Sequence, residues 1–94
     1  STWRVVSFVD NDKKTPEFKS MVITFQTNTK ATTLILWADG RAETYVESYT
    51  VVDDALVLSG KDYVTNAKYS INGKQMVLVT PKMRVVLEEI EEGV

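Results

Sequence analysis

Residues 33–46 read TLILWADGRAETYV. Two runs rich in β-branched and aromatic residues flank the dipeptide Asp39-Gly40, which is the strongest short-range signal for a β-hairpin. A two-residue loop at this dipeptide would pair Leu36 with Glu43 and Leu34 with Tyr45. The stretch therefore predicts two adjacent antiparallel strands with a defined register.

This register sorts the hairpin into two faces. One face carries no charge and comprises Thr33, Ile35, Trp37, Ala42, Thr44 and Val46. The other face carries Glu43 and Glu47 together with three apolar or aromatic residues, Leu34, Leu36 and Tyr45. Because burial of an unpaired carboxylate is costly, we expect the uncharged face to point inward and the second face to point outward.

Turn signals recur on both sides of this hairpin and divide the chain into about eight short β-type segments. They are Asp10-Asn11-Asp12, Asn28, Asp53-Asp54, Ser59-Gly60, Asn72-Gly73 and Pro81-Lys82. No helical stretch of useful length lies between them. The sequence predicts an all-β fold, a small eight-stranded antiparallel up-and-down barrel, as one domain over residues 1–94.

Two local features modify this pattern. Pro16 after Thr15 is typical of the start of a helix, so we expect a short helical turn or lid in the first loop with Phe18 pointing inward. The alternative is a surface loop whose Phe tucks into the core. For Tyr49 and Val51 to point inward as well, the strand after the Asp39-Gly40 turn would need a bulge near Ser48.

Composition narrows the function. The 94 residues include no histidine and no cysteine, so the usual general base and the commonest metal and thiolate ligands are absent. An enzyme is not expected, and no cofactor is predicted. The formal net charge is −2, and acidic and basic residues are interspersed along the chain without forming a basic patch. This pattern argues against nucleic-acid binding. The longest apolar run, residues 34–38, is too short to span a membrane.

Two groups of carboxylates need a separate assessment. Asp10, Asn11, Asp12 and Glu17 resemble a calcium loop only superficially, because the glycine at position six and the glutamate at position twelve are missing. Glu43 and Glu47 share a strand face but lie roughly 13 Å apart at strand rise. That distance is too long for paired-carboxylate catalysis, and we interpret both groups as solvated charges.

Several segments resemble the small lipocalin-like domains of the calycin group, which occur in bacterial secreted proteins and lipoproteins. These segments are Thr2-Trp3-Arg4-Val5-Val6-Ser7 near the start, residues 37–41, 49–51 and 67–71 in the middle, and Met83-Arg84-Val85-Val86-Leu87-Glu88 near the end. In that group a Gly-any-Trp motif places a Trp across the closed end of the barrel, beside a basic residue of the last strand. Trp3 matches the Trp, Arg84 is the corresponding basic residue, and Ser1 stands at the glycine position.

The resemblance implies a barrel with an apolar-ligand role and an extracytoplasmic location, periplasmic or as a surface lipoprotein. It implies no catalytic residue. Some apolar residues stand at positions that are expected to face outward. An engineered or designed relative of the group is therefore an alternative origin for this chain. These positions are Val6, Leu34, Leu36 and Val57.

Two functions from different classes follow. The first is a binding module for a small hydrophobic ligand. The ligand would enter the barrel at the end opposite Trp3, and residues 16–18 would cover that end. The predicted ligand-contacting residues are Phe18, Ile23, Phe25, Ile35, Trp37, Tyr49, Tyr69, Met76, Met83 and Val85. The second is an interaction protein with a filled core, which forms a homodimer through Leu34, Leu36 and Tyr45. An interior cavity would favour the first function.

Overall fold

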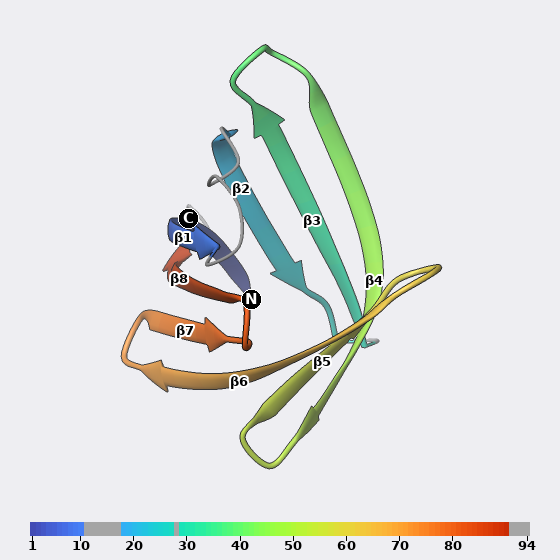
Figure 1. The fold of residues 1–94 in the computed structure, drawn as a ribbon, viewed down its shortest axis with the longest axis vertical. Coiled ribbons are helices and arrows are strands. Elements are labelled where there is room, and N and C mark those ends of the chain that lie inside the picture. Colours follow the sequence, from blue (N-terminus) through green and yellow to red (C-terminus); the bar gives the residue numbers. More distant parts are fainter. Residues whose placement is uncertain (11–17, 28, 91–94) are drawn as a thin grey trace.

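The chain forms a closed antiparallel barrel of eight strands, in which each strand pairs with the next and β1 pairs with β8 (Figure 1). The computed structural model describes residues 1–10, 18–27 and 29–90. The strands are β1 (Thr2–Asp10), β2 (Phe18–Phe25), β3 (Lys30–Trp37), β4 (Ala42–Val52), β5 (Ala55–Ser59), β6 (Val64–Asn72), β7 (Gln75–Val79) and β8 (Met83–Ile90). The predicted fold class and strand number are confirmed.

The predicted turn signals mark the real connections. Val52 pairs with Ala55, so β4 and β5 are joined by a two-residue loop in which Asp53 has a φ of 53°. Asn72 pairs with Gln75 across a second two-residue loop, where Gly73 has a φ of 62°. Two-residue hairpin loops favour positive φ because that backbone twist matches the twist of the strands.

The short helical turn predicted in the first loop is not borne out by the described residues. Phe18 and Lys19 belong to β2, and Phe18 pairs with Trp37 of β3, a pairing of two aromatic residues that favours a strand. Thr15, Pro16 and Glu17 lie outside the described residues. The described part of the chain contains no helix, and therefore none long and apolar enough to cross a membrane.

The register of the central hairpin differs from the prediction by one residue. Leu34 pairs with Thr44 and Leu36 pairs with Ala42. The Trp37 amide donates to the Arg41 carbonyl (2.8 Å), which leaves three residues in the loop instead of two. Gly40 closes this loop with a φ of 92°, the left-handed conformation found at the third position of a three-residue hairpin loop.

A shift of one residue moves every side chain of a strand to its other face. The inward face of β4 therefore carries Glu43, Tyr45 and Glu47, followed by Tyr49 and Val51 in the same phase. The bulge expected near Ser48 is not present. The prediction that Glu43 and Glu47 face outward is wrong, and so is the grouping of Tyr45 with Leu34 and Leu36.

A bulge does occur in β1, between Val5 and Ser7. Trp3 and Val5 point inward before it and are buried, whereas Phe8 packs against the core after it. The bulge explains why this strand carries apolar residues at both parities. The central core consists of buried side chains from seven of the eight strands: Trp3, Val5, Ile23, Ala31, Leu56, Ala67, Met76, Leu78, Val85 and Leu87.

Candidate functional site

A cavity of about 200 Å³ lies inside the barrel, at the end opposite Trp3. Every strand contributes to its wall. The lining residues are Phe8, Met21, Ile23, Thr33, Glu47, Leu58, Thr65, Ala67, Leu78, Thr80, Met83 and Val85. The wall is thus mostly apolar, with three threonine hydroxyls and a single carboxylate among the described residues that form it.

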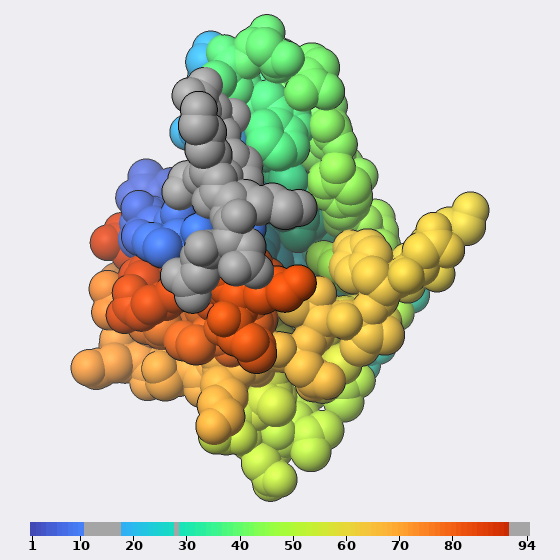
Figure 2. Space-filling view, viewed as in Figure 1, coloured from blue at the N-terminus to red at the C-terminus, as the bar shows by residue number. Residues whose placement is uncertain are grey.

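The β3–β4 hairpin rises beyond this end of the barrel (Figures 1 and 2). Residues 48–52 of β4 pair with β5, whereas residues 42–47 of β4 pair with β3 alone. The turn between β5 and β6 projects separately to one side. The inward face of β4 is therefore open to solvent at this end, and carboxylates can lie there without full desolvation.

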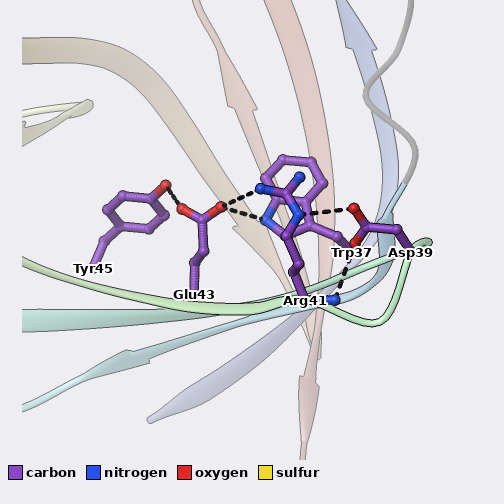
Figure 3. A network of polar contacts seen from close by, with 5 residues as sticks. All are labelled: Trp37, Asp39, Arg41, Glu43 and Tyr45. Carbon is purple, nitrogen blue, oxygen red and sulfur yellow. Dashed lines mark hydrogen bonds and ion pairs between the residues drawn. The ribbon is translucent and has the colours of Figure 1, made fainter.

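A polar network covers the inner face of the hairpin tip (Figure 3). The Trp37 indole Nε1 donates to Glu43 Oε1 at 2.9 Å, and the Tyr45 hydroxyl donates to the other Glu43 oxygen. Arg41 lies 3.7 Å from Glu43, donates from Nε to Asp39 at 2.8 Å, and stands 5.8 Å above the Trp37 ring. Glu43 therefore has three partners from its own hairpin.

The same contacts shift the ionisation of the network. Hydrogen bonds from the Arg41 backbone and side chain lower the pKa of Asp39 below its usual value. The hydrogen bond to Asp39 raises the pKa of Arg41, and the hydrogen bond to Glu43 raises the pKa of Tyr45. The charged forms of Asp39 and Arg41 and the neutral form of Tyr45 are therefore favoured at neutral pH.

Glu47 lies lower on the same face of β4, at the rim of the cavity. Its Oε2 accepts a hydrogen bond of 2.5 Å from the Tyr63 hydroxyl. This bond raises the pKa of Tyr63 to about 12. The Tyr63 ring packs directly over Gly60, where an added Cβ would lie 2.3 Å from the ring, and the Gly60 amide donates to the Tyr63 carbonyl. The β5–β6 turn thus holds Tyr63 against Glu47.

A second hollow, of about 230 Å³, lies at the Trp3 end. Four of the predicted ligand residues line it, namely Phe25, Tyr49, Tyr69 and Met76. The rings of Phe25 and Tyr49 make an edge-to-face contact at 5.1 Å, and the Tyr49 hydroxyl donates to the Gln26 carbonyl at 2.7 Å. These aromatic side chains are therefore fixed by contacts within the barrel.

The predicted ligand residues are thus divided between two ends. Ile23, Met83 and Val85 line the cavity opposite Trp3, and Phe18 packs edge-to-face on Phe8 above it, with ring centroids 6.3 Å apart. Ile35 is buried and pairs with Met21, whereas Trp37 belongs to the hairpin network. The structure does not bring the ten residues into one site.

The predicted pairing of Trp3 with Arg84 does not form. Trp3 is buried and its Nε1 donates to Ser1 Oγ at 3.0 Å. Arg84 is exposed near the start of β8, where it pairs with Val9 at the opposite end of β1. Because β1 and β8 are antiparallel, the first residues of β8 cannot reach the first residues of β1. Leu34 and Leu36 face outward as predicted, being 50% and 37% exposed.

Several residues of this end were not among the predicted ligand contacts, and Phe8, Met21, Glu47 and Tyr63 show why. The β1 bulge changes which residues of that strand face inward, so a strict alternation does not identify Phe8. Apolar residues at both odd and even positions of β1 were a usable signal of the bulge. Met21 alternates with Ile23, so its inward direction was readable. Glu47 was assigned outward through the hairpin register, and Tyr63 lies in a turn with no periodic pattern.

A wider hollow of about 480 Å³ lies along β5, β6 and β7. Outward-facing side chains such as Asn66 and Lys68 form much of its wall. Its larger volume reflects its shallow, open form. The less open cavity at the barrel end is therefore the better candidate for a ligand site.

Comparison with known proteins supports the fold. No protein-family model matches the chain, and no curated protein matches it. The chain is similar to a crystal structure of an uncharacterized protein from Bacteroides eggerthii DSM 20697, with a TM-score of 0.76 and 13% sequence identity. The match covers 96% of this chain and 98% of that chain. At this identity the likeness concerns the fold, an eight-stranded antiparallel barrel.

Proposed function

We propose that this protein is a non-enzymatic binding module that holds a small, largely apolar ligand in the cavity opposite Trp3, as lipocalin-like barrels do. The observation that carries the proposal is a cavity, open at one end, whose wall receives side chains from all eight strands. Such a wall is preformed, so a ligand gains from burial without ordering the protein first. Each Å² of apolar ligand surface removed from water contributes roughly 25 cal/mol.

The size of the cavity limits the ligand. Its volume of about 200 Å³ is smaller than the roughly 300–1,000 Å³ typical of sites for drug-sized molecules. The buried part of the ligand is therefore short, such as an alkyl chain of a few carbons. A longer molecule would extend through the open end, past the inner face of the β3–β4 hairpin.

The proposal predicts that hexanol, a short neutral probe, binds at this end. Amide and methyl chemical shifts should move for lining residues such as Met21 and Met83. Thr65→Leu fills the cavity from its wall and should weaken hexanol binding by about tenfold, or 1.4 kcal/mol. Ser70→Leu adds the same side chain at an exposed position of the same strand and should leave binding unchanged.

Titration by nuclear magnetic resonance distinguishes the outcomes. Shift changes spread over exposed apolar residues, or equal weakening by Thr65→Leu and Ser70→Leu, would contradict a ligand cavity. Shift changes confined to Phe25, Tyr49 and Tyr69 would place the ligand in the hollow at the Trp3 end and would also contradict the proposed site.

A second candidate function is self-association through the outer face of β3 and β4. Leu34, Leu36 and Val46 are 50%, 37% and 63% exposed on this face. A second copy is the partner that this proposal favours, since a two-fold axis brings an apolar patch against itself. This patch replaces the predicted set, because Tyr45 lies on the opposite face of β4.

A further inference from the structure

The charge of the cavity wall restricts which ligands it can hold. Among the twelve described residues that line it, Glu47 is the one with an ionisable side chain. Glu47 pairs with Ala31, whose exposure is 0%, so the base of the glutamate is anchored on a buried part of the sheet. The carboxylate itself is half-buried at the rim. It is therefore accessible from both the cavity and the open end.

Glu47 differs from Glu43 in its partners. Glu43 shares the cation Arg41 with Asp39 and also accepts hydrogen bonds from Trp37 and Tyr45. Within the described residues, no Lys or Arg side chain forms an ion pair with Glu47, whose hydrogen bond is to the neutral Tyr63 hydroxyl. That bond occupies Oε2 and fixes the orientation of the carboxylate. Among residues 1–10, 18–27 and 29–90, the negative charge of Glu47 thus has no ion-pair partner.

Aromatic side chains stand beside this carboxylate. Tyr63 contacts it directly through its hydroxyl, and Tyr45 is the preceding inward-facing residue of β4. Aromatic faces attract cations, and the attraction increases where water is partly excluded. A carboxylate that is hydrogen-bonded to a tyrosine and lines an apolar cavity is chemically complementary to an ammonium group with an apolar tail.

We propose that the ligand of this cavity is a short cationic amphiphile, an alkyl or arylalkyl amine, whose ammonium group pairs with Glu47 while its apolar part fills the cavity. This inference rests on the proposed function. An anionic head group would meet the like charge of Glu47, which opposes binding. A neutral head group would leave the carboxylate uncompensated. Charge therefore discriminates among ligands of equal size.

Three probes of equal chain length separate charge from burial: hexylamine, hexanol and hexanoate. At neutral pH hexylammonium should bind about tenfold more tightly than hexanol, the effect of one charge-assisted hydrogen bond. Hexanoate should bind more weakly than hexanol. Added salt should weaken hexylammonium binding and leave hexanol binding nearly unchanged.

Matched variants assign the preference to one residue. Glu47→Gln should equalise the affinities for hexylammonium and hexanol, while Glu88→Gln removes the same charge from an outer ion pair with Arg4 and should preserve the tenfold preference. Tyr63→Phe keeps the carboxylate and should also preserve the preference. If Glu47→Gln fails to fold, the salt dependence of hexylammonium binding to the parent still decides between a charged contact and burial alone.

The outcomes separate this inference from the proposed function. Equal binding of the three probes, or a preference for hexanoate, would overturn the cationic ligand and leave the apolar cavity standing. Persistence of the amine preference in Glu47→Gln would also overturn it. Absence of binding for all three probes would overturn both.

Discussion

At the scale of single residues, Glu47 and Tyr63 show how a local contact changes the character of an exposed side chain. Tyr63 is 47% exposed, yet its pKa is raised from 10.0 to about 12, chiefly by its hydrogen bond to Glu47. The neutral hydroxyl donates to a charged carboxylate, so loss of its proton would place two negative groups together. The neutral, hydrogen-bonded form of Tyr63 is therefore favoured at neutral pH.

This shift predicts a pH dependence. Because the folded-state pKa of Tyr63 lies above the unfolded value, its contribution to stability is complete below about pH 10 and is lost as the pH rises toward 12. Ring-carbon chemical shifts should show Tyr63 titrating near 12 in the parent. Glu47→Gln should move this titration toward 10. Glu43→Gln, which acts on Tyr45, should leave Tyr63 unchanged, and a parent Tyr63 that titrates near 10 would contradict the contact.

At the scale of elements, the β3–β4 hairpin shows what the sequence could and could not predict. Asp39-Gly40 correctly marks the turn, but the same dipeptide fits a two-residue loop and the end of a three-residue loop. The choice depends on which backbone amides pair, and Trp37 pairs with Arg41. Inward-facing carboxylates are costly only in a dry interior, whereas the part of β4 that carries Glu43 and Glu47 is open to solvent, and the predicted register is therefore wrong.

The register predicts which cysteine pairs can form a disulfide in a chain that has no cysteine of its own. Leu34 and Thr44 are directly opposite at a non-hydrogen-bonded position, where Cα atoms lie about 4.5 Å apart. Leu34→Cys with Thr44→Cys should oxidise readily, since this spacing suits disulfide geometry. Leu34→Cys with Tyr45→Cys places the two thiols on opposite faces and should stay reduced. Counting free thiols after mild oxidation shows whether each double-cysteine variant forms its disulfide. A disulfide in Leu34→Cys with Tyr45→Cys, and none in Leu34→Cys with Thr44→Cys, would support the two-residue loop instead.

At the scale of the whole molecule, the number and order of strands were readable because turn residues separate them at regular intervals. The depth of each side chain along the barrel was not readable, since it depends on the stagger between neighbouring strands. Phe25 and Met83 both point inward, yet they line hollows at opposite ends. A sequence pattern with period two gives the face of a residue and leaves its level in the barrel undetermined.

The outer face of the β3–β4 hairpin predicts that the whole molecule self-associates. Leu34, Leu36 and Val46 form an exposed apolar patch, which favours self-association of two copies. Leu34→Lys with Leu36→Glu keeps the net charge and should shift the sedimentation coefficient of a dimeric parent to that of a monomer. Tyr45→Ser changes the opposite face of β4 and should leave association intact. A parent that stays monomeric at high concentration would contradict the proposal, and dissociation by Tyr45→Ser alone would assign the contact to the inner face, in direct competition with the ligand cavity.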